Sequence, residues 1–183
     1  MDAIEVLRTL RAVRTYSEQA VPPDVLHDIL EVARWTGSAK NSQPWELVVV
    51  ENRNTLEQLA GMGHYAGHLA GAPLGVVLVM EGPGRAFDAG RLAQSIMMAA
   101  WAHGVGSCIA SIFPAENEQR ARQLLHVPEE QSVQTVIALG YPADAQALRL
   151  RSAPDTVRSE VRGGRKPLAA LVSWEQYGRR ERT

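Results

Sequence analysis

Short apolar runs alternate with helix-like segments as far as Leu139, and this order limits the chain to few folds. Val, Ile and Leu are frequent in the apolar runs, which indicates strands at Glu46–Val50, Leu74–Met80, Ser107–Ile112 and Val133–Leu139. Helical spacing or a helix start signal marks four segments around them, Pro22–Trp35, Asn54–Leu59, Arg85–His103 and Glu116–Leu125. Strands and helices mixed in this way predict one layered domain of the α+β or α/β class.

Length and charge exclude several classes of protein. The 183 residues suit one domain that buries about 70% of its unfolded surface. A formal net charge of −1 argues against a general nucleic-acid partner. The start of the chain lacks a signal-peptide pattern, and no apolar run reaches the ~20 residues that span a bilayer. We therefore expect a cytoplasmic protein with neither nucleic acid nor membrane as a partner.

The last forty or so residues differ from the rest of the chain. Residues 142–183 carry nine Lys or Arg residues against five Asp or Glu residues, and apolar periodicity begins only at Leu168. A segment with so little core of its own is better suited to wrapping another surface than to forming a second domain. We expect residues 1–183 to form a single domain in which residues 142–183 are a C-terminal extension.

The segment Ser38–Trp45 connects a predicted helix to a predicted strand and carries Ser, Lys, Asn, Ser and Gln close together. A helix-to-strand connection usually needs only a few turn residues. Short hydrogen-bonding side chains held between two rigid elements can bind the edge of a polar heterocycle. The alternative is an ordinary polar loop whose Asn and Ser close turns.

Cationic groups occur near both ends of the chain. Arg11 and Arg14 are three residues apart near the end of the first helical segment, so both could clamp one phosphate. Arg165 offers a third cation, and two solvated arginines are the alternative for the pair. The junction Pro114–Asn117 follows a strand and opens a helix, so its backbone amides could donate to a ligand or simply cap the helix.

Other chemistries lack support in the sequence. His64 and His68 are four residues apart, but the surrounding glycines disfavour a helix and no third ligand is near, so we expect no metal site. Cys108 is the single cysteine, which excludes an intrachain disulfide, and in an apolar strand it is expected to be an inert core thiol. No Gly-x-Ser-x-Gly pattern marks a nucleophilic serine.

Two motifs resemble those of one known family. Leu10–Tyr16 is similar to an Arg-Arg-Ser-x-Arg-x-Phe opening, and Ala39–Trp45 matches a Pro-Ser-x-x-Asn-x-Gln-Pro-Trp loop nearly residue for residue. Both belong to the nitroreductase family of flavin enzymes. Gly104–Cys108, Leu139–Pro142 and Arg165–Leu168 resemble later motifs of the family in the same order, so the likeness covers almost the whole chain.

The resemblance implies an α+β fold with a central, mostly antiparallel sheet flanked by helices. It further implies an intertwined homodimer with FMN at the interface, in which Arg85–His103 forms the dimer core and residues 142–183 wrap the partner subunit. The implied activity is an oxidoreductase: NAD(P)H reduces FMN at N5, and a nitroaromatic, quinone or similar acceptor is then reduced in a ping-pong cycle. The cofactor carries the redox chemistry, so no catalytic serine or carboxylate pair is required.

The resemblance also implies roles for individual residues. Glu116 is expected near flavin N5, and His64, Tyr65 and His68 are expected on the substrate side. The cofactor-binding residues implied by the motifs are Arg11, Ala12, Arg14, Ser38, Lys40, Asn41, Gln43, Glu116, Asn117 and Arg165.

Three positions depart from the family pattern. Leu10 and Ala12 remove an arginine and a serine that bind phosphate in the motif, and Gly37 replaces the loop proline. These departures leave two alternatives open: a flavin-binding protein that stores or senses the cofactor with little turnover, and a relative that performs flavin breakdown, dehalogenation or dehydrogenation.

Overall fold

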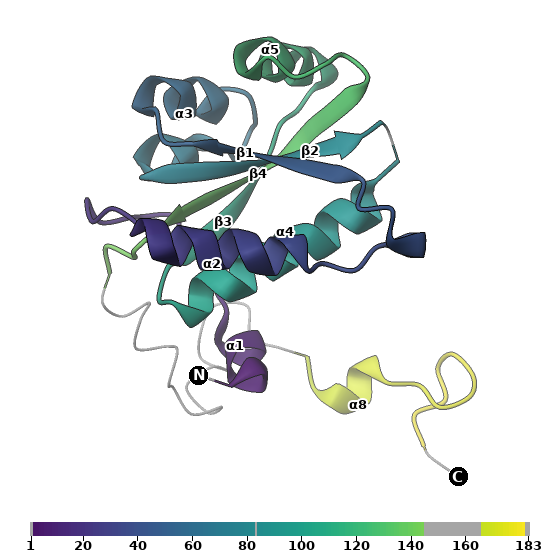
Figure 1. Cartoon of the computed structure of the whole chain (residues 1–183). Coiled ribbons are helices and arrows are strands. Elements are labelled where there is room, and N and C mark those ends of the chain that lie inside the picture. The colour runs from purple at the N-terminus through teal and green to yellow at the C-terminus, as the bar shows by residue number, and fades with distance from the viewer. Residues whose placement is uncertain (1, 83, 145–165, 182–183) are drawn as a thin grey trace. The chain divides into compact units, whose positions relative to one another are not determined.

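A four-stranded sheet organises the computed structural model, which describes residues 2–82, 84–144 and 166–181 (Figure 1). The strand order is β1-β2-β4-β3, and every neighbouring pair is antiparallel. The strands are β1 Trp45–Val50, β2 Leu74–Glu81, β3 Gly106–Ser111 and β4 Gln131–Gly140. This confirms the expected α+β fold with an antiparallel sheet, and each predicted strand lies within two residues of its expected bounds.

Helices cover both faces of this sheet (Figure 1). α2 and α4 pack on one face, whereas α3, α5 and the short 3-10 helix η2 pack on the other. The helices of this part are α1 Ala3–Thr9, α2 Pro23–Arg34, α3 Arg53–Ala60, α4 Ala86–Ala102 and α5 Ala115–Leu125, with η1 at Ala39–Asn41 and η2 at Gly67–Gly71. Among the described residues, no helix is both long and apolar enough to cross a membrane.

Strand β2 shows how the sequence builds two cores. Leu74, Val76 and Leu78 pack into the α2–α4 core, while Val77 and Val79 pack into the core under α3 and η2. Successive side chains of a strand point to opposite faces of a sheet, so a continuous apolar run is buried on both sides. The run at 74–80 is therefore the central part of the fold, as its sequence predicts.

The segment after α1 departs from the expectation that Arg11 and Arg14 lie on a helix end. The helix stops at Thr9, and Leu10 already has an extended conformation with φ −50° and ψ 129°. The following residues run along β3, where Val13 N–H donates to the Ser107 carbonyl at 2.9 Å. Gly106 permits this approach, because a Cβ there would lie 2.7 Å from the Val13 side chain. The two arginines are thus presented by an extended segment.

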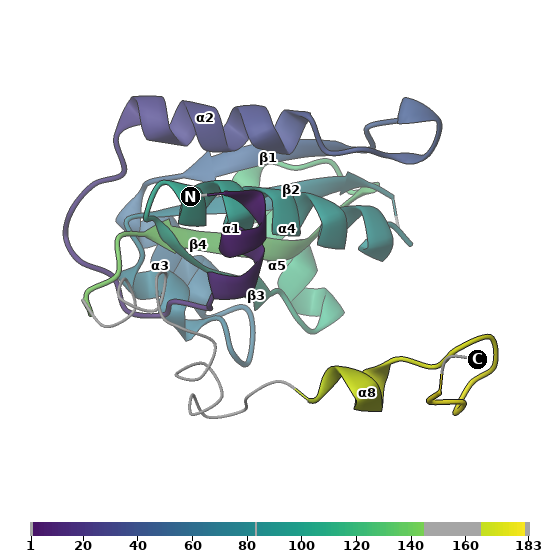
Figure 2. The same ribbon diagram turned by 90° about the horizontal axis from the view of Figure 1, so that it is seen from below.

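α1 packs against α4 (Figure 2), and a buried tryptophan near the C-terminal end of α4 holds the two helices together. The indole N–H of Trp101 donates to Thr9 Oγ1 at 2.9 Å, and both residues are fully buried. Val6 and Val13 pack against the same indole. Trp101 therefore connects α4 to α1 and to the extended segment that follows it.

The contacts divide the chain into two compact units, Met1–Arg151 and Ser152–Thr183. In the second unit, the described residues 166–181 hold a short helix, α8 at Leu168–Leu171, and a turn in which Trp174 N–H donates to the Arg179 carbonyl. Arg165 and most of the proposed extension lie outside the described residues. The role expected for residues 142–183 stays a prediction.

Candidate functional site

A cavity of about 320 Å³ lies where the extended segment after α1 meets β3 and α4. Its walls come from residues of these three elements: Leu10, Arg11, Ala12, Arg14, Met97, Ser107, Cys108 and Ile109. We call it the arginine cavity. The structure thus brings Arg11, Ala12 and Arg14 together, although Arg11 and Arg14 do not lie on a helix end as expected.

Local hydrogen bonds hold residues 10–16 in place, and we call this stretch the arginine segment. Arg11 Nη1 donates to the carbonyls of Arg8 and Leu10, at 3.1 and 2.8 Å. The Tyr16 hydroxyl donates to the Val13 carbonyl at 2.6 Å, and burial raises the pKa of Tyr16 well above its ordinary value. A phenol that stays protonated keeps this hydrogen bond at every physiological pH.

The arginine cavity offers hydrogen-bond donors to an anion. Ser107 is buried, and its Oγ has no hydrogen-bond partner among the described residues. Arg14 lies beside Cys108, and burial raises the pKa of that thiol even though the guanidinium opposes the shift. The thiol therefore remains neutral, so it does not offset the positive charge of the Arg14 guanidinium. Two guanidinium groups beside an unpartnered hydroxyl suit a phosphate group.

The Ser38–Gln43 loop is more constrained than an ordinary polar connection. Lys40, Asn41 and Gln43 have positive φ values of 53°, 53° and 46°. Such left-handed backbone in non-glycine residues costs of order 1–3 kcal/mol each and is concentrated at functional sites. Gln43 N–H donates to Ser38 Oγ at 2.8 Å and closes the loop. The side chains of the three residues with left-handed backbone remain exposed. The loop therefore presents Lys40, Asn41 and Gln43 to solvent in a fixed conformation.

The loop and the arginine cavity lie apart within one copy of the described chain. None of Ser38, Lys40, Asn41 and Gln43 lines the arginine cavity. A second depression of about 620 Å³ lies at the start of the loop, between the end of α2 and α4, and Gly37 and Arg91 line it. One copy of the chain thus presents two separate parts of the expected site.

Asn117, at the start of α5, makes local side-chain hydrogen bonds. Asn117 Nδ2 donates to the Phe113 carbonyl at 3.0 Å, and Asn117 Oδ1 accepts from Arg120 Nη1 at 3.1 Å. The Asn117 side chain is therefore engaged by Phe113, just before α5, and by Arg120 within it. Glu116 is exposed and lines neither the arginine cavity nor the depression beside Gly37.

The three residues expected on the substrate side occupy different surroundings. The His64 ring lies 6.1 Å from the ring of Phe113, next to the start of α5, and Tyr65 is 92% exposed. His68 Nε2 lies 3.4 Å from the carbonyl of Cys108, a residue of the arginine cavity. No cluster of three or more potential metal ligands occurs among the His, Cys, Asp and Glu residues that the structure describes.

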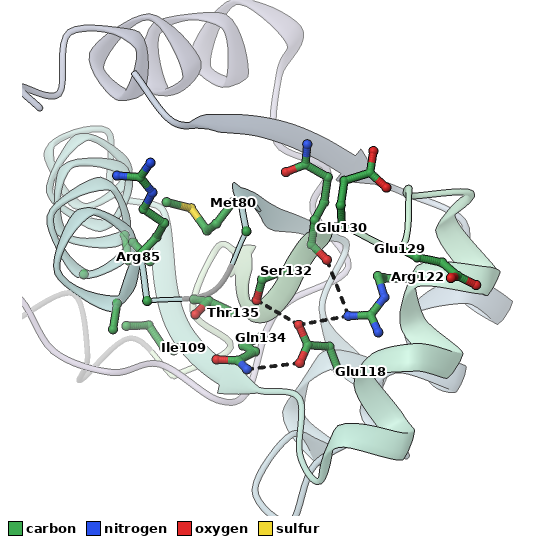
Figure 3. A pocket seen from close by; sticks show the side chains of 17 residues that line it. Met80, Arg85, Ile109, Glu118, Arg122, Glu129, Glu130, Ser132, Gln134 and Thr135 are labelled. Atoms are coloured by element: carbon green, nitrogen blue, oxygen red, sulfur yellow. Dashed lines mark hydrogen bonds and ion pairs between the residues drawn. The ribbon is translucent and has the colours of Figure 1, made fainter. Parts of the chain in front are cut away.

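A further cavity, of about 410 Å³, contains a buried carboxylate that sequence reasoning missed (Figure 3). Glu118 accepts hydrogen bonds from Ser132 Oγ at 2.8 Å, Val133 N at 3.1 Å and Gln134 Nε2 at 3.0 Å. Arg122 Nη1 lies 3.2 Å from the same carboxylate. The i,i+4 spacing of Glu118 and Arg122 was visible in the sequence, but the hydrogen-bond partners of Glu118 on β4 were not. With its acceptors occupied, Glu118 joins α5 to β4.

Replacing Glu118 with glutamine should lower the free energy of unfolding at pH 7 by about 1–3 kcal/mol, because an amide leaves a buried donor unpaired. Burial works against ionisation, but the hydrogen bonds from Gln134, Ser132 and Val133 hold the pKa of Glu118 below its ordinary 4.5. The carboxylate thus stabilises the fold above pH 4.5 and loses this effect as the pH falls through its lowered folded value. Chemical denaturation should show the difference shrinking below pH 4.5. An equal loss in exposed Glu116→Gln would contradict this role.

Comparisons with known proteins give a consistent likeness. The sequence profile of the Nitroreductase family matches residues 7–64 and 62–141. A putative NADH dehydrogenase/NAD(P)H nitroreductase of Methanothermobacter thermautotrophicus is 30% identical over 167 residues, covering 87% of each chain. One with the same description from Archaeoglobus fulgidus is 28% identical over 151 residues, covering 78% of this chain and 87% of the relative.

Solved structures show the same likeness in three dimensions. An FMN-dependent nitroreductase from Clostridium difficile has a TM-score of 0.71 at 27% identity, over 77% of this chain and 88% of the other. A putative NADH dehydrogenase/NAD(P)H nitroreductase from Bacteroides thetaiotaomicron has a TM-score of 0.72 at 29% identity, over 78% and 87%.

Proposed function

Because the chain belongs to the nitroreductase family, we propose that it is an FMN-dependent oxidoreductase that uses NAD(P)H to reduce a nitroaromatic, quinone or similar acceptor. The observation that carries the proposal is the donor set of the arginine cavity: Arg11, Arg14 and the unpartnered hydroxyl of Ser107. The names of the relatives support NAD(P)H and FMN as the reactants.

The FMN phosphate fits the arginine cavity by charge and by donor type. Arg11 and Arg14 bring positive charge to the phosphate, and a guanidinium group can bind a phosphate through two N–H groups. Ala12 pairs with Ser107 across a parallel bridge, so Ser107 is the backbone neighbour of the position where the family motif has serine. Ser107 therefore supplies a hydroxyl donor that Ala12 lacks. Arg165, from the region outside the described residues, is proposed as a third cation.

We further infer that a second copy of the chain completes the site. In one copy the Ser38–Gln43 loop and the arginine cavity are separate, so a homodimer has to bring the loop of one subunit to the cavity of the other. Large side chains near the loop are suited to such an interface, since Trp35 is 75% exposed and Phe87, on α4, is 77% exposed. The segment 142–183 is proposed to wrap the partner subunit.

Each part of the site has a defined task in this proposal. Bound FMN supplies the hydride chemistry. Asn41 and Gln43 hydrogen-bond the polar edge of the cofactor, with Ser38 and Lys40 beside them. Backbone groups of Glu116 and Asn117 face the reactive part of the ring, and His64, Tyr65 and His68 shape the acceptor side. These side chains orient the reactants and stabilise negative charge on them.

Anaerobic mixing tests this function directly. Purified protein loaded with FMN should lose its flavin absorbance on addition of NADH or NADPH and should recover it on addition of a nitroaromatic or quinone. Flavin that remains oxidised with both nucleotides would contradict the enzyme. Bound but unreduced FMN would instead support a storage or sensing protein, the alternative favoured by Leu10 and Ala12. Failure to take up FMN would defeat both.

A further inference from the structure

Arg91 of α4 lies against Gly37, the residue just before the Ser38–Gln43 loop. A Cβ placed on Gly37 would lie 2.9 Å from Arg91 Nη2 and 3.8 Å from Arg91 Cζ. The guanidinium thus occupies the space that a side chain at position 37 would need. Arg91 Cζ also lies 5.8 Å from the centre of the Phe87 ring, within the range of a cation–π contact. Gly37, Phe87 and Arg91 line the same depression.

This contact lies at the start of a loop that stores backbone strain. Three non-glycine residues of the loop, Lys40, Asn41 and Gln43, have left-handed φ values. Strained backbone conformations persist only where several contacts with the surrounding structure hold them in place. The Ser38–Gln43 hydrogen bond closes the loop upon itself. A glycine just before it adds conformational freedom, and that freedom has to be restricted by a contact from outside the loop.

We propose that Arg91 is a positioning residue: its guanidinium packs on Gly37 and Phe87 and fixes the start of the Ser38–Gln43 loop, so that Asn41 and Gln43 keep their conformation. The family motif has a proline at position 37, which restricts φ by its ring. In this chain, the side chain of Arg91 restricts the backbone at Gly37 by contact instead. The claim that this conformation serves FMN binding rests on the proposed function.

The lysine content of the chain allows a selective test of loop opening. Lys40 and Lys166 are the two lysines in the sequence, and Lys166 precedes Pro167, where lysine-specific endoproteases cut poorly. Cleavage of the folded protein by such a protease therefore reports on Lys40, at the tip of the loop. Where opening and closing are fast, the cleavage rate follows the population of the open state.

Arg91→Ala should speed cleavage at Lys40 by about tenfold, which corresponds to a modest shift in the opening equilibrium. Gly37→Ala should have a similar effect because the new Cβ displaces the guanidinium, and the double variant should be no faster than either single one. Gln94→Ala, on the same depression of α4, is the matched control and should cleave like the wild type. Urea denaturation should show equal global stability for Arg91→Ala and the wild type, because Arg91 is exposed.

Unchanged cleavage in Arg91→Ala would overturn the proposal, as would additive effects of the two substitutions or a loss of global stability large enough to explain the faster cleavage. FMN affinity separates this inference from the proposed function. Arg91→Ala should weaken FMN binding several-fold, and added FMN should slow cleavage of the wild type at Lys40. Faster cleavage with unchanged FMN affinity would confirm that Arg91 positions the loop, and it would contradict the assignment of the loop to the cofactor.

Discussion

Replacing Arg14 with alanine should raise the dissociation constant for FMN by about 10- to 100-fold, since a charge-assisted hydrogen bond contributes roughly 1.5–3 kcal/mol. Arg14 lines the arginine cavity together with Ser107, and the proposed phosphate has few other donors there because Leu10 and Ala12 provide none. The FMN dissociation constant of Arg14→Lys should fall between those of the wild type and Arg14→Ala, because lysine keeps the charge but loses the planar pair of donors. Quenching of flavin fluorescence during titration measures these affinities.

A surface arginine on another element provides the control for this substitution. Arg53 on α3 pairs with Glu57 at 3.4 Å and does not line the arginine cavity. Arg53→Ala removes the same charge and should leave FMN affinity unchanged. The free energy of unfolding of apo Arg14→Ala should also match that of the wild type, because the side chain is exposed. Retention of wild-type affinity by Arg14→Ala would remove Arg14 from the site.

Trp101→Ala should cause the largest loss of stability, about 3–5 kcal/mol, because it leaves a large cavity in a packed region. The indole is fully buried, donates to Thr9 and packs against Val13 of the arginine segment. The substitution should therefore also weaken FMN binding, through the loosened segment that carries Arg11 and Arg14. Urea denaturation measures the first effect, and flavin titration of the protein that remains folded measures the second.

Trp101→Phe separates packing from hydrogen bonding at this position. Phenylalanine keeps most of the apolar volume but leaves the Thr9 hydroxyl without the indole donor, so the expected loss is about 1–2 kcal/mol. A loss below about 1 kcal/mol for Trp101→Ala would show that α1 is not anchored through this residue.

The strands and helices could be predicted from the sequence because their signals are local. The continuous apolar run at Leu74–Met80 indicates a strand buried on both faces, and β2 has this environment. The motif Leu10–Tyr16 likewise singled out Arg11 and Arg14 together, and both line the arginine cavity. The expectation that they share a helix end was wrong, since Leu10 turns into extended chain and pairing with β3 replaces helical hydrogen bonding.

Long-range contacts could not be predicted in this way. The Glu118 carboxylate reaches partners 14 to 16 residues away on β4, and their proximity depends on how α5 packs. Gly37 was visible only as a departure from a motif. The guanidinium that lies where a side chain at position 37 would stand belongs to Arg91, on α4. The separation of the Asn41–Gln43 region from Arg14 also depends on the three-dimensional arrangement, which the order of motifs does not record.

Co-expression of two defective variants tests most directly whether one FMN site is assembled from two copies of the chain. Arg14→Ala lacks the phosphate half of the site, and the double variant Asn41→Ala/Gln43→Ala lacks the loop half. If each site combines both halves from different subunits, random pairing restores intact binding at about a quarter of the sites, because half of the dimers are mixed and each has one intact site. Arg14→Ala paired with Arg11→Ala should restore none. Recovery of high-affinity FMN binding and NAD(P)H-dependent flavin reduction in the first mixture alone is the predicted result. Equal absence of binding in both mixtures would contradict a site shared between subunits.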